Sequence, residues 1–245
     1  MTDSIDPRRG VVEERMSGIR RIVAVTGSKG GIGKSVVATL LALHLADTGR
    51  RVGLFDLDLT SPTDHLVLGA RFGVPDEVFG IDPYRVEGVD LMSIAGLSHG
   101  AALPLRGTGA TEALLEMLAI TRWGELDLLV VDMPPGLGDT TLDVIELLPR
   151  TEFLIVADGS PVVIDSVRRA VDLLVSLGKP IIGVFENMSR GDAGAVERLA
   201  ISARIAYLGA AGSDPGLEGA IGDGRALRAT NLYRSMRSLA AHVHR

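Results

Sequence analysis

Hydrophobic and polar positions along the chain fall into two patterns, short apolar runs and longer stretches with helical periodicity. The apolar runs predict strands at 21–26, 52–56, 89–94, 127–132, 152–157, 180–185 and 205–208. Several of these runs are apolar throughout, as strands buried on both faces are. The stretches between them predict helices at 34–48, 110–122, 140–148, 161–177 and 192–202, with shorter helices after 215 and after 231. This alternation predicts an α/β fold in which helices cover both faces of a mostly parallel sheet.

Two segments depart from the alternation. Residues 60–88 are rich in Gly, Pro and Asp and predict a long loop with local structure. Residues 1–19 are charged and lack the apolar stretch of a secretory signal, so we expect a mobile tail there. No repeat or low-complexity linker divides the remainder, and one domain is expected over 20–245.

Composition narrows the possible functions. The 245 residues are 46% hydrophobic, which suffices for one sizeable core, and the net charge of −6 argues against a general nucleic-acid-binding surface. The absence of cysteine excludes disulfides, Cys-ligated zinc and a thiol nucleophile, and it suits a reducing cytoplasm. No apolar run reaches the roughly 20 residues of a membrane span. We therefore expect a cytoplasmic protein without a nucleic-acid or membrane partner.

The segment "TGSKGGIGKS" at 26–35 follows a predicted strand and begins a predicted helix, which is the context of a phosphate-binding loop. Glycines allow the backbone to approach phosphate closely, and N–H groups at a helix start bind anions. Lys34 would reach the β- and γ-phosphates of a nucleotide, and the Ser35 hydroxyl would bind Mg²⁺. The residues expected around the phosphates are Gly30, Gly31, Ile32, Gly33, Lys34, Ser35 and Val36.

The phosphate-loop pattern usually begins with Gly, and this chain has Ser28 there. The alternative interpretation is a glycine-rich turn with surface lysines. The coincidence of strand, loop, Gly-Lys-Ser and helix favours the phosphate loop.

Acidic residues end two of the predicted strands. In "LLVVDMPPGLGD", Asp132 follows an apolar run and would hold Mg²⁺, and the loop after it would respond to the γ-phosphate. In "GLFDLDLTSPT", Asp56 and Asp58 lie two residues apart, and neighbouring carboxylates repel unless a cation lies between them. Ordinary turn carboxylates are the alternative at each place.

Together these motifs resemble the Mrp-type (ApbC-like) ATPases, within the deviant Walker A group that includes MinD and ParA. The resemblance covers residues 20 to about 225. It rests on the segments "KGGIGKS", "DLDLTSPT", "WGELDLLVVDMPPGLGD", "GVFENMS" and "LGAAGSDPGLEGAIGDG". The glycine that Ser28 replaces varies in this group. The resemblance implies a single-domain P-loop NTPase that binds ATP and Mg²⁺ and hydrolyses ATP slowly, with stimulation by dimerisation or a partner.

The resemblance also implies roles for particular residues. Lys29 would reach the partner's nucleotide phosphates across a homodimer, where a cation stabilises the transferring group; a solubilising charge is its other interpretation. Asp58 would position the attacking water, and Asp56 would support the Mg²⁺ shell. Gly136 would sense the γ-phosphate through its backbone.

At the base, Asn187 would hydrogen-bond the adenine and the loop at Asp214–Pro215 would help to enclose it. Asn187 is alternatively a turn residue at the strand end. The family commonly has Thr where this chain has Leu137, so no hydroxyl is available there.

Iron–sulfur carriers of this family continue after "ENMS" into a C-x-x-C segment, whereas this chain reads "ENMSRGDAGAVERL" and has no cysteine. A cluster bound by its own thiolates is therefore excluded. We expect an accessory ATPase of iron–sulfur or metallocofactor maturation, with a cysteine-bearing carrier or an apo-protein client as partner.

Two other functions remain open: a MinD/ParA-like spatial organiser or nucleotide-gated binding module, and a degenerate member that binds ATP and barely hydrolyses it. The C-terminal stretch "NLYRSMRSLAAHVHR" has apolar residues at helical spacing and basic residues beside them. A helix packed on the domain is expected there, and contact with anionic lipid is the alternative.

Overall fold

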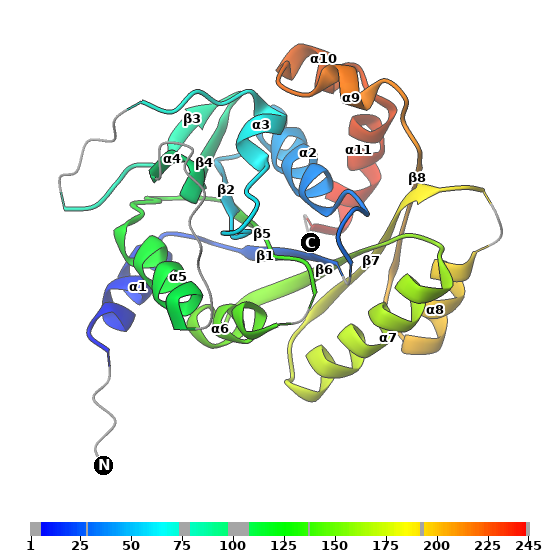
Figure 1. The fold of residues 1–245 in the computed structure, drawn as a ribbon, viewed down its shortest axis with the longest axis horizontal. Helices are drawn as coiled ribbons and strands as arrows, with labels where there is room; N and C mark the ends of the chain where they lie inside the picture. Colours follow the sequence, from blue (N-terminus) through cyan, green and yellow to red (C-terminus); the bar gives the residue numbers. More distant parts are fainter. Residues whose placement is uncertain are drawn as a thin grey trace.

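The computed structural model describes residues 6–27, 29–73, 79–97, 108–136, 138–191 and 194–243. An eight-stranded sheet crosses the molecule in the order β3-β4-β2-β5-β1-β6-β7-β8 (Figure 1). Its strands are β1 (Ile22–Gly27), β2 (Val52–Asp56), β3 (Tyr84–Val86), β4 (Val89–Ser93), β5 (Leu128–Asp132), β6 (Thr151–Ala157), β7 (Ile181–Ser189) and β8 (Tyr207–Gly212). All pairings are parallel except β3 with β4. The predicted α/β class with a mostly parallel sheet is confirmed.

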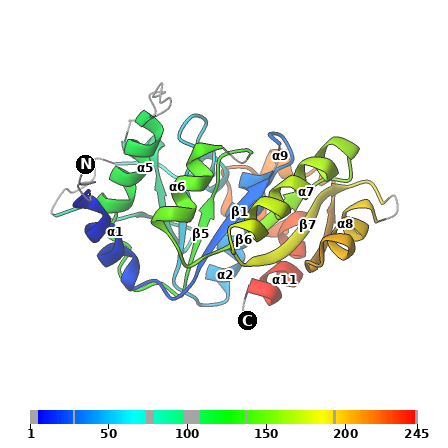
Figure 2. The same cartoon turned by 90° about the horizontal axis from the view of Figure 1, so that it is seen from below.

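Helices lie on both faces of this sheet. On one face α2 packs against β1, β2 and β5, and α11 packs on α2 and β8; the other face carries α5, α6, α7 and α8, with α1 against α5 (Figure 2). The longer helices are α1 (Arg8–Ser17), α2 (Lys34–Asp47), α5 (Thr108–Ile120), α6 (Asp139–Leu147), α7 (Pro161–Ser176), α8 (Ala195–Ala203) and α11 (Asn231–Val243). The shorter ones are α3 (Asp64–Leu68), α4 (Ile94–Leu97), α9 (Leu217–Ala220) and α10 (Gly224–Ala229). The central strands β1 and β5 are fully buried and β6 is buried except at Glu152, because helices cover them from both sides.

One sequence expectation needs correction, and the structure gives detail to a second. Residues 8–17, expected within a mobile tail, form α1, whose Val12 and Met16 are buried and which packs on α5. Residues 1–5 lie outside the described part of the chain. The segment 60–88, expected as a long loop with local structure, contains the short helix α3 and the short strand β3, which pairs with β4. Tertiary contacts stabilise these short elements, and the local sequence pattern did not reveal them.

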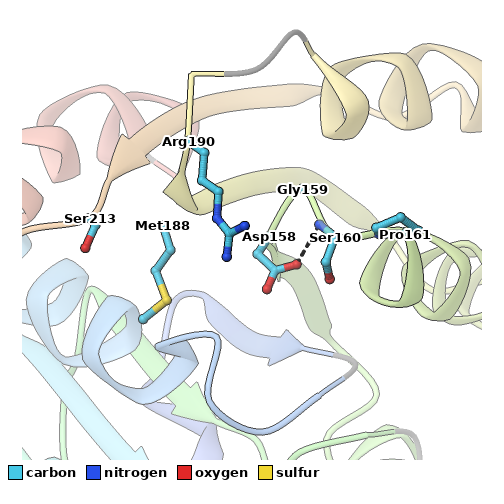
Figure 3. Close-up of a pocket in the computed structure, with 7 residues that line it drawn as sticks. All are labelled: Asp158, Gly159, Ser160, Pro161, Met188, Arg190 and Ser213. Carbon is cyan, nitrogen blue, oxygen red and sulfur yellow. Dashed lines mark hydrogen bonds between the residues drawn. The ribbon is translucent and has the colours of Figure 1, made fainter.

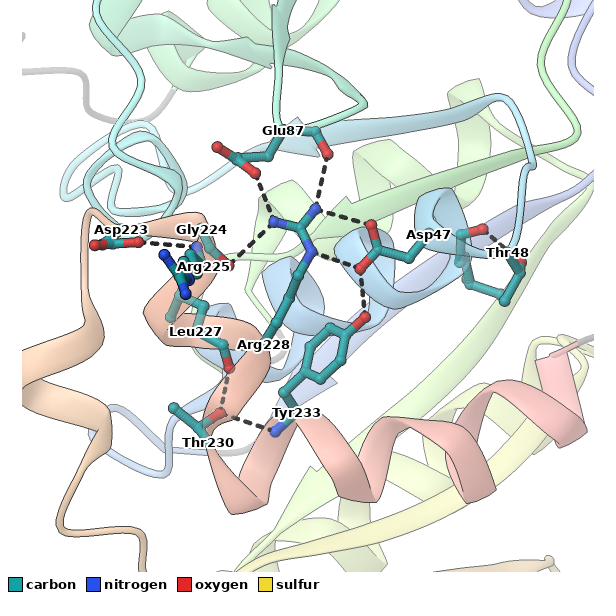
Figure 4. A network of polar contacts seen from close by, with 11 residues as sticks. Asp47, Thr48, Glu87, Asp223, Gly224, Arg225, Leu227, Arg228, Thr230 and Tyr233 are labelled. Atoms are coloured by element: carbon teal, nitrogen blue, oxygen red, sulfur yellow. Dashed lines mark hydrogen bonds and ion pairs between the residues drawn. The ribbon is translucent and has the colours of Figure 1, made fainter.

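The C-terminal segment is held on the domain as the packed-helix interpretation predicts. Five side chains of α11 are buried: Leu232, Met236, Leu239, Ala240 and Val243. Next to α11, Arg228 of α10 donates two hydrogen bonds to Asp47 of α2 and one to the Glu87 carboxylate, and the Tyr233 hydroxyl donates to Asp47 (Figure 4). We call Asp47, Glu87, Arg228 and Tyr233 the Arg228 network. It ties three segments that are far apart in the sequence.

The register of the sheet positions the acidic residues. Asp56 at the end of β2 lies opposite Asp132 at the end of β5, and Asp132 lies opposite Val25, two residues before β1 ends and the phosphate loop follows. The carboxyl ends of parallel strands meet at one edge, where α/β proteins bind ligands. The sheet therefore brings both predicted carboxylates beside the loop.

Candidate functional site: a nucleotide cavity backed by three buried carboxylates

A cavity of about 550 Å³ lies over the loop between β1 and α2. The P-loop contributes Lys29, Gly30, Gly31, Gly33, Lys34, Ser35 and Val36 to its lining. The opposite wall comes from the segment after β2, from Pro135 after β5 and from Ile221 between α9 and α10. The residues that the sequence assigned to phosphate binding thus surround one space, except Ile32, whose side chain is buried.

Glycine is required at the start of α2. Gly33 has φ +75° and Gly31 has φ +84°, a region that other residues adopt at a cost. A Cβ at Gly33 would also lie 2.5 Å from the side-chain nitrogen of Asn187. The Asn187 amide donates a 2.8 Å hydrogen bond to the Ile32 carbonyl. Gly33 therefore permits both the turn and the contact between β7 and the P-loop.

Lys34 faces away from solvent although it lines the cavity. Its ammonium forms an ion pair with the Asp132 carboxylate and lies 3.2 Å from the Ser35 hydroxyl. Only 7% of the lysine side chain and none of the Asp132 side chain is exposed. To bind a phosphate in the cavity, Lys34 must leave this carboxylate.

Asp56 is also completely buried and accepts hydrogen bonds from the polypeptide around it. Its oxygens accept from the backbone N–H groups of Asp58, Thr63 and Asp64, at 3.2, 3.1 and 3.3 Å. The Ser93 hydroxyl donates a fourth bond at 3.2 Å. Asp56 thus anchors the segment that carries Asp58 and α3.

A third buried carboxylate, which sequence reasoning missed, lies beside these two. Asp64 is the first residue of α3 and is 0% exposed. One ligand oxygen each from Asp56, Asp64 and Asp132 lies within 4.8 Å of the others. We call these residues the acidic triad. The signal in the sequence was the pair Thr63–Asp64, which is typical of a helix start, within a segment interpreted as loop.

Burial and mutual repulsion govern the charge of the acidic triad. Burial raises the pKa of Asp56, and the charge of Asp132 raises it further. Burial followed by the charges of Asp132 and Asp56 raises the pKa of Asp64 well above its usual value. Burial also raises the pKa of Asp132, against the opposing effect of Lys34. These carboxyls therefore favour the protonated form unless a cation compensates their charge, and one lysine cannot compensate three carboxylates.

Asp58 and Lys29 lie on the solvent side of the acidic triad. The Asp58 carboxylate accepts a 2.8 Å bond from the Thr60 hydroxyl and a 3.0 Å bond from the Ser61 N–H, and it lines the cavity. Lys29 is exposed at the same cavity. Gly136, with φ +89°, donates its N–H to the Gly27 carbonyl at 3.0 Å. Lys29, Lys34 and Asp58 thus line one cavity, and their catalytic roles stay predictions.

The residues predicted for the base lie beyond this cavity. Asn187 is buried within β7, so it is no turn residue. Asp214 caps α11: its carboxylate accepts the N–H groups of Asn231 and Leu232 at 2.6 and 3.1 Å. Their neighbours Met188 and Ser213 line a second cavity of about 410 Å³, together with Asp158 and Arg190 (Figure 3). The enclosure of a base by Asn187, Asp214 and Pro215 stays a prediction.

The acidic triad fits the divalent cation that the sequence implies. The Oδ2 atoms of Asp64 and Asp132 have no hydrogen-bond partner among the described residues. Buried carboxylate oxygens without a partner are costly, and hard cations bind oxygen ligands. Ser35, Asp56 and Asp132 would hold Mg²⁺, and Asp64 is within reach of the same position.

The fold and this site define a P-loop NTPase of the MinD/ParA group. Residues 18–200 match the family model described as ParA, NUBPL iron-transfer P-loop NTPase, and the chain belongs to that family. The resemblance to Mrp-type ATPases is thereby confirmed.

Curated relatives carry the name iron-sulfur cluster carrier protein. The protein of Deinococcus radiodurans is 38% identical over 185 residues, which cover 74% of this chain and 53% of the relative. That of Escherichia coli K12 is 36% identical over 177 residues, which cover 71% of this chain and 48% of the relative. This chain therefore spans about half the length of these relatives.

Solved structures agree with the fold. A nucleotide-binding protein from Archaeoglobus fulgidus in complex with ADP is 27% identical, with a TM-score of 0.76 over 92% of this chain and 95% of that one. The cell division ATPase MinD of Pyrococcus furiosus is 22% identical, with a TM-score of 0.69 over 91% of this chain and 98% of that one, and shows the fold alone. Among the described helices, none has the length and apolar character needed to cross a membrane.

Proposed function

We propose that this protein binds ATP with Mg²⁺ and hydrolyses it slowly as a cytoplasmic, nucleotide-bridged homodimer. The observation that carries the proposal is the cavity in which Lys29, Lys34 and Asp58 meet over the P-loop. Mg²⁺ at Ser35, Asp56 and Asp132 would supply positive charge next to the phosphates. The N–H groups at the start of α2 would bind the phosphate oxygens.

In this proposal each residue has one task. Lys34 leaves Asp132 and binds the β- and γ-phosphates. Asp58 orients the attacking water from its position on the cavity wall. Lys29, exposed beside the same cavity, reaches the phosphates bound by the partner subunit and offsets charge in the transition state. Asn187, through its contact with the P-loop, and the loop at Asp214–Pro215 enclose the base.

A mixing experiment tests the trans role of Lys29. Lys29→Ala and Asp58→Ala should each bind ATP and hydrolyse it poorly. In a mixed dimer, one of the two sites contains both intact residues and the other contains neither. Recovery of part of the activity on mixing is expected. Failure to recover activity, with heterodimers demonstrated by two affinity tags, would contradict the trans role.

For the biological role we propose an accessory ATPase of iron–sulfur or metallocofactor maturation. Its support is the family and the curated relatives that are named as cluster carriers. The chain has no cysteine, so it cannot bind a cluster through its own thiolates. It would act on a cysteine-bearing carrier or on an apo-protein client through its ATP cycle.

Two assays test this role. After anaerobic incubation with iron and sulfide, the purified protein should retain neither iron nor acid-labile sulfide on desalting. An affinity pull-down with protein locked in its ATP state by Asp58→Ala should enrich cysteine-bearing cluster proteins. Enrichment of nucleoid or septum proteins would favour the MinD/ParA-like organiser. The burial of the apolar stripe of α11 does not support the lipid contact that such an organiser could use.

A further inference from the structure

We propose that Asp64 is a metal-binding residue of this protein and that the acidic triad binds a divalent cation in the absence of nucleotide. The inference goes beyond the proposed function, because it requires neither ATP nor hydrolysis. Three observations carry it: the position of Asp64, its unpartnered oxygen and the surplus of buried negative charge.

The position of Asp64 is built from three elements of the fold. Its Oδ1 accepts a 2.9 Å hydrogen bond from the Thr39 hydroxyl of α2, and Thr39 is also completely buried. Its backbone N–H donates to the Asp56 carboxylate at the end of β2. α3, β2 and α2 thus hold the Asp64 side chain in one place, and a fixed carboxylate binds a cation at a lower entropic cost than a mobile one.

The Oδ2 atom of Asp64 is the oxygen that we expect to bind the cation. It is buried and has no hydrogen-bond partner among the described residues. The ligand oxygens of Asp56 and Asp132 lie within 4.8 Å of the Asp64 ligand oxygen. Two oxygens on opposite sides of one cation are about 4.2 Å apart for Mg²⁺ and about 4.8 Å apart for Ca²⁺. The three carboxylates therefore bracket a space of the size that one divalent cation occupies.

The charge of the acidic triad favours a divalent cation over a second monovalent group. When all three carboxyls are ionised, one ammonium leaves a surplus of two negative charges in a buried place. A divalent cation neutralises this surplus, and carboxylates are the ligands that Mg²⁺, Mn²⁺ and Ca²⁺ take in proteins. A monovalent ion would leave one buried charge without compensation.

Occupation of the acidic triad also affects Lys34. Its ammonium contacts Asp132 Oδ1, the carboxylate that the cation would share. Two cations at one carboxylate repel, so Lys34 would turn away from Asp132 toward the cavity that it lines. The same step removes the ion pair that competes with phosphate for Lys34. Cation binding at the triad would therefore prepare the P-loop for nucleotide.

The test is a titration of the metal-stripped full chain with Mn²⁺ alone, followed by electron paramagnetic resonance and calorimetry. The wild-type protein should bind one Mn²⁺ per chain, and Asp64→Asn should weaken this binding at least tenfold. Asp143→Asn is the matched control, because Asp143 also accepts a threonine hydroxyl, that of Thr111, but lies outside the triad. It should leave the affinity within twofold of the wild type.

Each outcome of the titration supports or overturns the proposed cation site. Absence of Mn²⁺ binding to the wild-type protein overturns the proposal, as does equal binding by Asp64→Asn, which would assign the ion to the other two carboxylates. If Asp64→Asn fails to fold, Thr39→Val replaces it; it leaves the carboxylate but removes its hydrogen bond, and unchanged affinity would count against the site. Lys34→Ala should tighten Mn²⁺ binding, and weaker binding would contradict the competition.

ATP binding is measured separately on the same wild-type protein. Its failure would refute the proposed function and leave the Mn²⁺ result standing.

Discussion

The Arg228 network and the acidic triad both gather charged groups from distant parts of the chain, but they differ in how those charges are paired. Arg228 makes five hydrogen bonds, to Asp47, to Glu87 and to the Gly224 carbonyl, and about a third of each charged side chain remains exposed. In the acidic triad three carboxylates share one ammonium, and all three are completely buried.

The pKa values reflect this difference. Although burial would raise it, hydrogen bonds from Arg228 and Tyr233 hold the pKa of Asp47 below its usual value. In the acidic triad burial prevails, and the pKa values of all three carboxyls rise. Paired charges at a half-exposed place stabilise the fold, whereas unpaired buried charges cost stability and favour a ligand. The contrast separates a cluster whose charges are paired within the chain from one that favours a bound cation.

Replacement of Lys34 should have the largest effect, because this lysine pairs with the triad and is proposed to bind the phosphates. Lys34→Ala should lower ATP affinity at least 1,000-fold, about 4 kcal/mol. It should also lower the free energy of unfolding in EDTA by about 3 kcal/mol, since Asp132 loses its ion-pair partner. Fluorescent-nucleotide titration and urea unfolding measure the two effects. ATP binding within tenfold of the wild type would show that Lys34 is not the phosphate ligand.

Arg228→Ala should affect stability alone. Loss of the five hydrogen bonds leaves Asp47 and Glu87 without their guanidinium partner, and the free energy of unfolding should fall by about 2–3 kcal/mol. Arg225→Ala on the same helix, where the arginine is exposed, is the control and should change it by less than about 0.5 kcal/mol. ATP affinity should stay within twofold. A selective loss of ATP affinity would mean that the network belongs to the site.

Asp64→Asn should stabilise the protein, whereas Lys34→Ala and Arg228→Ala should destabilise it. In EDTA at pH 7 it should raise the free energy of unfolding by about 1–3 kcal/mol, because it removes a buried charge and can keep the hydrogen bond to Thr39. The pKa of Asp64 in the folded protein lies above the unfolded value of 3.8. The free energy of unfolding of the wild-type protein therefore falls as the pH rises from 3.8 toward the folded-state pKa. The gain from Asn should therefore be near zero at pH 4 and grow toward pH 7. Urea unfolding at several pH values measures it, and a loss of stability at pH 7 would contradict the assignment of uncompensated charge.

Tyr233→Phe should have the smallest effect on stability, and it tests how the members of the Arg228 network depend on one another. It removes the hydroxyl bound to Asp47 but leaves both Arg228 bonds to that carboxylate. The free energy of unfolding should fall by about 1 kcal/mol. A double-mutant cycle with Arg228→Ala should show coupling between the two residues. Strict additivity would mean that the hydroxyl and the guanidinium act independently on Asp47.

The strands and long helices could be predicted because their patterns are local. "VGLFD" at 52–56 is an apolar run between turn residues, and β2 has those bounds. The strand β3 could not be predicted, because "YRV" is partly exposed and depends on its pairing with β4. α1 is strongly charged and depends on contacts between α1 and α5 that no local pattern reveals.

The residues of the site also differ in whether a local sequence pattern could predict them. Asp56 and Asp132 were predicted because each ends an apolar run, and the parallel sheet brings such ends together. Asp64 was missed because it lies eight residues beyond Asp56, in a segment whose Gly and Pro content suggested loop. Its role depends on Thr39 of α2 and on Asp132 of β5, and these contacts exist only in the folded protein.

The hydrogen bond from Asn187 to the Ile32 carbonyl makes the P-loop and the end of β7 one mechanical unit. A movement of the P-loop that displaces this carbonyl must either break the bond or pull Asn187 with it. The next residue, Met188, has φ +55°, a left-handed conformation that costs a side-chain-bearing residue about 1 kcal/mol. The end of β7 therefore contains a strained backbone position, directly beside a residue held by the P-loop. A nucleotide that moved the P-loop would therefore shift Met188 through a single side chain, that of Asn187.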